Sequence, residues 1–430
     1  MNMKHKYYFA SITAALLLLT GCQQSQNSGS SSDSSAQVVT GTQPTSSEAT
    51  SSTEPQTTEP VTDITTEAQT TAPVPEPLSN IVNCDKIKLP DDIRSFDKIE
   101  RTSDGFSGIA YCNKDSGKID MAYLHISEDM QTVEKSLLTP PENQGGYSLL
   151  YQYFALEGSD IWSFAIMESH GDLKPYDPQT DGDSFDWEKW NAAKQEQYLL
   201  CHYDKNGSLL STIPANELQD YRNPQNGEFG NIKSFDCVDG VLYMTIFDDR
   251  VLQINKETAG VTLVSDLNKD DIYYNEKLLC FDRDNKPLLL QEKVTYAPDK
   301  HTINEAVVSE FDIESSSCGQ MLYTTGDNWD RAKISVIKGC GEYRLFINTY
   351  SELIGIKDDG TQEVLIDIDA SDLATQIKTS DNDYVPYTDD LFDINIVPVD
   401  DTQFLGFYQH YPECRTDGFC LTRKPESEIG

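Results

Sequence analysis

The sequence predicts an all-β fold: a β-propeller of six four-stranded blades, or seven if an insertion hides one. Two observations predict it. From residue 81 onward the chain consists of short apolar runs with period-two alternation, separated by Asp-Gly, Asn-Gly and Asp-Asp turns, which is typical of antiparallel sheet. These runs also recur in groups of four, as the blades of a propeller do.

The predicted strands form six groups in chain order. The first comprises Ile99, Ile109–Tyr111, Met121–Ile126 and Val133–Leu138, and the second Leu149–Ala155, Ile161–Met167, Tyr198–Tyr203 and Leu209–Ile213. The third and clearest comprises Ile232–Val238, Val241–Phe247, Arg250–Ile254 and Val261–Val264. The fourth comprises Leu278–Phe281, Leu288–Gln291, Val307–Phe311 and Met321–Tyr323, and the fifth Ile334–Ile337, Tyr343–Ile347, Leu353–Ile356 and Val364–Ile366.

The third and fifth groups align without a gap, since Ile232 corresponds to Ile334 and Val251 to Leu353. The last group has only three strands, Phe392–Val397, Phe404–Tyr408 and Phe419–Thr422. We expect residues 81–89 to supply the fourth strand and close the ring, which would hide two sheet edges. A two-sheet β-sandwich or two small β-domains is the alternative, because the repeats carry no WD, kelch or Asp-box signature.

Residues 1–21 have the outline of a signal peptide, with Lys4 and Lys6 ahead of an apolar stretch too short for a confident membrane span. The ending Leu19-Thr20-Gly21-Cys22 resembles the lipobox of bacterial lipoproteins. That resemblance implies that Cys22 becomes diacylated and is the first residue after cleavage. We therefore expect a protein anchored by lipid to the extracellular face of the cell membrane. The alternative is an ordinary secretory signal in which Cys22 is incidental.

Residues 22–80 are predicted to be a disordered stalk behind this cysteine. From residue 23 the segment has no aromatic residue, Lys, Arg or Cys, and 24 of its 58 residues are Ser or Thr. Such a segment cannot bury enough apolar surface to offset the entropy of ordering it. The predicted propeller domain thus spans residues 81–430.

Composition excludes some functions. The chain has 71 acidic and 33 basic residues and a net charge of −38. A polyanion of this density repels phosphate backbones, so a nucleic acid partner is not expected. Two loops are rich in acids, one with Asp177, Asp181, Asp183 and Asp186 and one with Asp381, Asp383, Asp389, Asp390 and Asp393. Solvated loops are the simplest interpretation, a calcium site the next, and no other cofactor or metal is expected.

Ten cysteines include nine after Cys22, and no zinc-like spacing occurs among them. Cys414 and Cys420 flank a short loop, and Cys84 should lie beside Cys420 if the ring closes as proposed, so either pair is a disulfide candidate. Cys237 and Cys280 are interpreted as small buried residues on inner strands.

An insertion from Glu168 to Gln197 interrupts the second group. Asp186 is expected to cap a short helix in which Trp187 and Trp190, three residues apart, share a face. They would form an aromatic platform for sugar rings or a partner protein, or else pack the helix onto the propeller. Trp329, Tyr384 and Tyr387 are further ligand-binding candidates.

No catalytic motif is present, so an enzyme is not expected, although a glycosidase needs only two suitably spaced carboxylates. The whole arrangement resembles Gram-positive surface lipoproteins in which a lipobox and a Ser/Thr stalk precede a propeller-like domain, of the kind found ahead of ABC-type solute-binding domains. We expect a binding protein for a glycan, peptide or partner protein at the cell surface. The alternatives are the leading part of a solute-uptake lipoprotein working with ABC-transporter components, since the chain stops at Gly430, and a propeller glycosidase or lyase using acidic loop residues.

Overall fold

The computed structural model describes residues 81–423 except 114–118, 143–145, 178–184, 223–231, 268–273, 275, 298–299, 327–333, 350, 368–393 and 411–414. The predicted signal peptide and stalk therefore lie outside the described residues. So do Cys22, Trp329, Tyr384, Tyr387, Cys414 and the acidic loop at 381–393.

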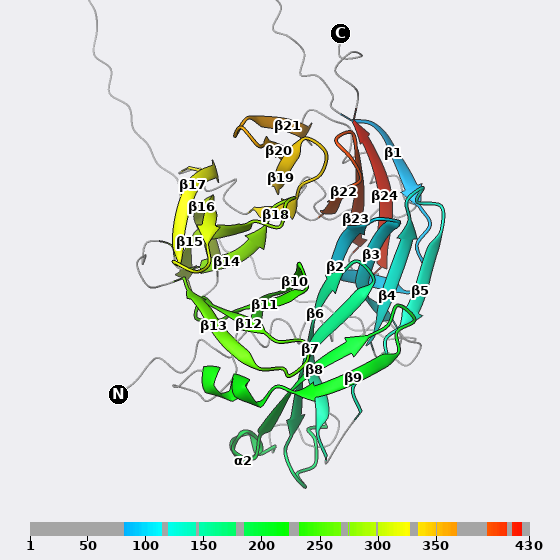
Figure 1. Cartoon of the computed structure of the whole chain (residues 1–430). Helices are drawn as coiled ribbons and strands as arrows, with labels where there is room; N and C mark the ends of the chain where they lie inside the picture. The colour runs from blue at the N-terminus through cyan, green and yellow to red at the C-terminus, as the bar shows by residue number, and fades with distance from the viewer. Residues whose placement is uncertain are drawn as a thin grey trace, which may run out of the picture.

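The described chain forms six four-stranded antiparallel sheets arranged in a ring, so the predicted six-bladed propeller is confirmed (Figure 1). Blade 1 consists of β2 (Ile93–Thr102), β3 (Gly105–Asn113), β4 (Ile119–Ser127) and β5 (Val133–Leu137). Blade 2 consists of β6 (Ser148–Glu157), β7 (Asp160–Ser169), β8 (Gln195–Tyr203) and β9 (Leu209–Pro214). Blade 3 consists of β10 (Ile232–Val238), β11 (Val241–Ile246), β12 (Arg250–Ile254) and β13 (Val261–Asp266).

Blade 4 consists of β14 (Glu276–Phe281), β15 (Pro287–Ala297), β16 (Lys300–Asp312) and β17 (Ser317–Thr324). Blade 5 consists of β18 (Ser335–Lys338), β19 (Tyr343–Asn348), β20 (Glu352–Lys357) and β21 (Gln362–Asp367). Blade 6 combines β22 (Ile394–Pro398), β23 (Gln403–His410) and β24 (Arg415–Arg423) with β1 (Ile81–Ile87), which pairs antiparallel with β24. The predicted closure by the first strand is therefore confirmed.

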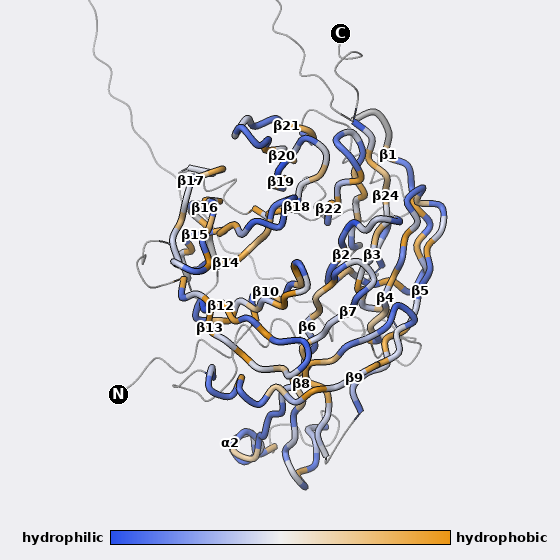
Figure 2. The backbone as a smooth tube through the Cα atoms, viewed as in Figure 1, coloured by the Kyte–Doolittle hydropathy of each residue, from blue (hydrophilic) through white to orange (hydrophobic). Residues whose placement is uncertain are grey.

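The apolar core is divided among the interfaces between neighbouring blades. Hydrophobic and hydrophilic residues alternate along the strands, so each sheet has apolar side chains to bury on its faces (Figure 2). Each of the six interfaces holds its own buried cluster; that between blades 2 and 3, for example, contains Phe164, Tyr198, Phe235 and Met244. This closed cycle of interfaces replaces the single core that the alternative β-sandwich would have.

Candidate functional site in the central channel

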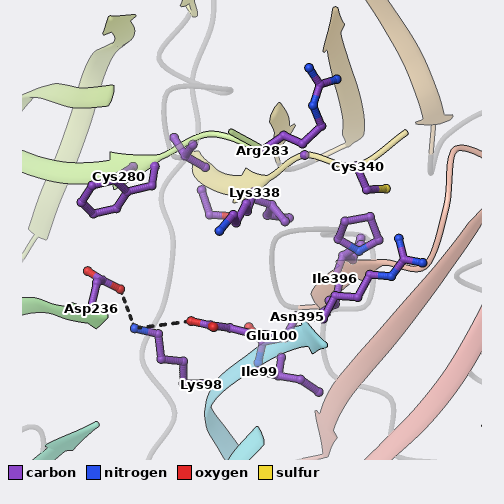
Figure 3. A pocket seen from close by; sticks show the side chains of 18 of the residues that line it. Lys98, Ile99, Glu100, Asp236, Cys280, Arg283, Lys338, Cys340, Asn395 and Ile396 are labelled. Atoms are coloured by element: carbon purple, nitrogen blue, oxygen red, sulfur yellow. Dashed lines mark hydrogen bonds and ion pairs between the residues drawn. The ribbon is translucent and has the colours of Figure 1, made fainter. Parts of the chain in front are cut away.

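A cavity of about 720 Å³ lies where the innermost strands meet, and it is lined by β2, β10, β14, β18 and β22 of five blades (Figure 3). This volume falls within the range of small-molecule sites. Apolar side chains such as Phe96, Ile99 and Ile396 share the wall with ionisable ones. The channel therefore combines apolar walls with a few polar groups, as binding sites do.

Two β-bulges bring the ionisable residues of β2 to the channel. The pairing of β2 with β3 shifts between Ile93 and Ser95 and again between Phe96 and Lys98. Each bulge inserts one residue without a directly opposed partner and changes the phase of the strand after it. Beyond the second bulge, Lys98 and Glu100 stand two residues apart on one face of the strand.

Lys98 links blade 1 to blade 3 across the channel. Its Nζ donates to Oδ1 of Asp236 at 2.5 Å and to the carbonyl oxygen of Phe235 at 2.8 Å, and it lies 4.0 Å from Oε1 of Glu100. Burial disfavours the charged form of Lys98, but the carboxylates of Asp236 and Glu100 outweigh it and raise its pKa. Lys98 is therefore a fixed cation between two carboxyl groups.

Glu100 has the most perturbed carboxyl group of the channel. Its side chain is 35% exposed, and it lies in the wall of a cavity that five blades line. Desolvation raises its pKa to about 7, against the opposing effect of Lys98 and with a further rise from Asp236. Glu100 therefore changes charge near neutral pH.

Three further cations line the channel, one each from blades 1, 4 and 5. Arg283 donates through its Nη2 to both oxygens of Asp358, at 3.1 and 3.0 Å, and through Nη1 to the carbonyl of Gly341 at 3.0 Å. Lys338 donates to Oδ1 of Asn285, a neutral acceptor. Arg101 acts on the thiol of Cys340, whose pKa is raised mainly by burial and lowered in part by this guanidinium.

The lining has a different charge balance from the molecule as a whole. Four cations and three carboxyl groups line the cavity: Lys98, Arg101, Arg283, Lys338, Asp97, Glu100 and Asp236. Arg283 is paired with Asp358 outside the lining, so the cations and carboxyl groups of the channel are balanced. The chain as a whole carries −38, so the channel is far less anionic than the rest of the protein.

Sequence reasoning did not identify these channel residues. A usable signal was present, because β2 and β10 share the series Ser-Phe-Asp at Ser95–Asp97 and at Ser234–Asp236. A repeated acid on two innermost strands indicates that these carboxyl groups approach the propeller axis. Cys237 and Cys280 lie on innermost strands as predicted, and both line the channel. Cys237 is buried as predicted, whereas Cys280 is only half-buried because its strand borders the channel.

The insertion in blade 2 contains the predicted helix, α2 (Trp187–Ala192), and Asp186 caps it by accepting a 2.9 Å hydrogen bond from the Lys189 N–H. The two tryptophans have different environments. Trp190 stacks on His170, with ring centroids 3.5 Å apart, so it packs the helix onto the blade. Trp187 is 50% exposed beside Tyr176 and Phe185. Phe185 contacts both tryptophans, with ring centroids 4.7 and 5.6 Å away, so they belong to one aromatic cluster of which Trp187 is the most exposed member.

The strand pairing bears on the disulfide candidates. Cys84 lies opposite Leu421, whereas Cys420 lies opposite Asp85. Opposed residues share a face, so Cys84 and Cys420 point to opposite faces of the sheet. Cys420 carries a free thiol, and Cys414, its other predicted partner, lies outside the described residues.

Two features are absent from the part of the chain that the structure describes. No helix there is long and apolar enough to cross a membrane. Among the same residues no group of three or more His, Cys, Asp or Glu is placed to hold a metal ion. Of the first acidic loop, Asp177 and Asp186 are described and Asp181 and Asp183 are not.

Comparisons with known protein families and with curated proteins found no match. Solved structures of similar shape include YCF48 bound to D1 peptide, with 10% identity and a TM-score of 0.37 over 82% of this chain and 100% of that one. A mutant Trypanosoma rangeli sialidase with trans-sialidase activity has 11% identity and a TM-score of 0.41 over 80% of this chain and 59% of the sialidase. KlAtg21, in a complex with the coiled coil of AgAtg16, has 10% identity and a TM-score of 0.34 over 75% of this chain and 77% of that one. Likenesses of this size say nothing about what this chain binds.

Proposed function

We propose that this chain is a lipid-anchored binding protein of the extracellular membrane face, whose propeller takes a small polar ligand, a glycan or peptide fragment, into its central channel. The channel carries the proposal: about 720 Å³, lined by five blades, with apolar walls and converging ionisable groups. The lipobox at Cys22 and the Ser/Thr-rich segment after it support the location.

The experiment is thermal unfolding of the full-length protein with a panel of oligosaccharides and short peptides. A ligand at a hundredfold excess over its dissociation constant stabilises by about 2.7 kcal/mol and raises the melting temperature. Asn395→Trp fills the channel from an exposed position on β22 and should abolish the shift. Asn206→Trp, in an exposed turn outside the channel, is the matched control. A shift that survives N395W places the ligand elsewhere, with Trp187 the first position to test.

The anchor is tested separately by growing cells with labelled palmitate. Label is expected on the wild-type protein and on Cys318→Ala, and not on Cys22→Ala. Equal labelling of the C22A variant would overturn the anchor and leave the channel proposal intact. Co-purification with ABC-transporter components after crosslinking in membranes would extend the function to solute uptake.

Glycoside hydrolysis is a second candidate, favoured by one observation. Glu100, with a pKa of about 7, and Asp236 both contact Lys98, so a protonated acid and a carboxylate face the same space. Lys98 stands between the two groups, which favours binding over hydrolysis. Release of reducing ends that is lost in both Glu100→Gln and Asp236→Asn would establish the enzyme; intact recovery of every sugar that binds would exclude it.

A further inference from the structure

The channel contains two cations that form no ion pair among the described residues. Arg101 and Lys338 line the cavity from blades 1 and 5, and both side chains are exposed. Neither is within ion-pair distance of a described acid, whereas Lys98 is paired with Asp236 and Arg283 with Asp358. Two cations without an ion-pair partner in one cavity attract an anion.

The surroundings of this pair are fixed by other contacts. Lys338 is held by the side-chain oxygen of Asn285, whose Nδ2 in turn donates to Asp239 at 2.6 Å. Asp400, which acts on Cys340 beside Arg101, is occupied within its own turn, because it accepts from the N–H groups of Thr402 and Gln403 at 2.7 Å. These contacts hold both acids in place, and neither acid forms an ion pair with Arg101 or Lys338.

We propose that the channel ligand carries a carboxylate, which binds between Arg101 and Lys338 while the body of the ligand lies against the apolar wall. This inference rests on the proposed function. Two sources share this chemistry: an acidic sugar residue and the carboxyl terminus of a peptide.

Glu100 couples this site to pH. Lys338 lies close enough to lower the pKa of Glu100, so the two groups influence each other directly. The other charged groups around Glu100 are Lys98 on its own strand, Asp236 on β10 and Glu157 at the end of β6. Ionised Glu100 opposes a bound carboxylate, and protonated Glu100 does not. Affinity should rise about threefold as the pH falls from about 8 to about 6.

The test is calorimetric titration of the full-length protein with galacturonate and galactose, and with short peptides bearing a free or an amidated carboxyl terminus. The acidic member of one pair should bind at least about tenfold tighter than its neutral partner. Arg101→Gln and Lys338→Gln should each remove about tenfold of that affinity. Lys86→Gln and Arg415→Gln, exposed cations outside the channel, should remove none. Glu100→Gln should abolish the pH dependence.

The outcomes separate this inference from the proposed function. If neutral ligands bind as tightly as acidic ones, and binding is lost in N395W, the channel is a binding site but not for a carboxylate. Acidic ligands that bind equally well to R101Q and K338Q also overturn the inference. If none of the four ligands binds and the unfolding panel gives no shift, the proposed function fails as well.

Discussion

The inner strands of blades 1 and 3 begin alike and end differently. Both start with Ile, a basic residue and Ser-Phe-Asp, at Ile93–Asp97 and Ile232–Asp236, and both have a bulge at the basic residue. Only β2 has a second bulge, at Asp97. Asp236 therefore stays in register opposite Tyr243 and accepts a hydrogen bond from Lys98, whereas Asp97, which also lines the channel, accepts a 3.1 Å hydrogen bond from the Tyr111 hydroxyl.

The difference shows how one extra residue converts a structural strand into part of a site. After the shared segment, β10 continues with Cys237, which packs into the interface of blades 2 and 3. The second bulge instead lets β2 direct Lys98 and Glu100 toward Asp236. Both strands pack into interfaces between blades, and β2 adds Lys98 and Glu100 to the channel beside Asp236 of β10.

The largest effect on stability is expected from removing the equivalent phenylalanines of β10 and β2, which tests whether the two strands pack differently. Phe235 is 4% exposed within the core, whereas Phe96 is only half-buried at the channel wall, where it contacts Phe407. Phe235→Ala should lower the free energy of unfolding by about 3–5 kcal/mol and Phe96→Ala by about 2 kcal/mol. Urea denaturation measures both. Equal losses would mean that the two strands pack alike.

Removing Lys98, the cation of β2 that binds Asp236, tests the ionic contacts that distinguish β2 from β10. Lys98→Met leaves Asp236 and Glu100 without their shared partner in a largely desolvated channel, so the free energy of unfolding should fall by about 3 kcal/mol. Lys86→Met on the outer strand β1 removes an exposed cation 3.9 Å from Asp417 and should cost less than about 0.5 kcal/mol. If K98M were as stable as K86M, the contacts of Lys98 with Asp236 and Glu100 would not stabilise the fold, contrary to this account.

Asp97 and Asp236 occupy equivalent sequence positions in β2 and β10, so their Asn variants form a matched pair for comparison. Asp236→Asn removes the carboxylate bound by Lys98 and should cost about 1–2 kcal/mol, whereas Asp97→Asn should cost about 0.5 kcal/mol. D236N should also lower the pKa of Glu100, since the charge of Asp236 raises it. Similar costs for both variants would show that the second bulge does not separate their roles.

The smallest effect is the pH dependence of stability. The pKa of Glu100 is about 7 in the folded protein and near 4.5 when unperturbed, so both states are protonated below 4.5. Between these values the unfolded state loses its proton first, and stability falls as the pH rises. Glu100→Gln should therefore gain about 1 kcal/mol relative to wild type from pH 4.5 to pH 7, and no more above it, a modest amount because channel water reaches the side chain. A pH-independent difference would contradict the raised pKa.

The blades could be predicted from the sequence because they are local. Alternating apolar residues and turn residues within a short stretch of sequence predict each four-stranded meander. The closing strand is predicted because the last blade lacks a fourth strand of its own. The helix at Trp187 was equally local, since Asp186 and the spacing of the two tryptophans define it.

The residues of the channel could not be predicted from the sequence, for two physical reasons. Lys98 and Asp236 are 138 residues apart and meet only because the ring closes. Glu100 faces the channel because of a bulge, which no alternation pattern reveals. The contrast between Trp187 and Trp190 had the same origin, since it depends on where His170 lies in the folded blade.

The most direct test of this account is the pKa of Glu100, measured by NMR titration of the protein carrying ¹³C-labelled glutamate and assigned by its loss in Glu100→Gln. A value of about 7 that falls in Asp236→Asn is predicted, because burial and the facing carboxylate act together on this group. A value near 4.5 in both proteins would show that Glu100 does not lie in the channel with Lys98 and Asp236, and the proposed site would fall with it.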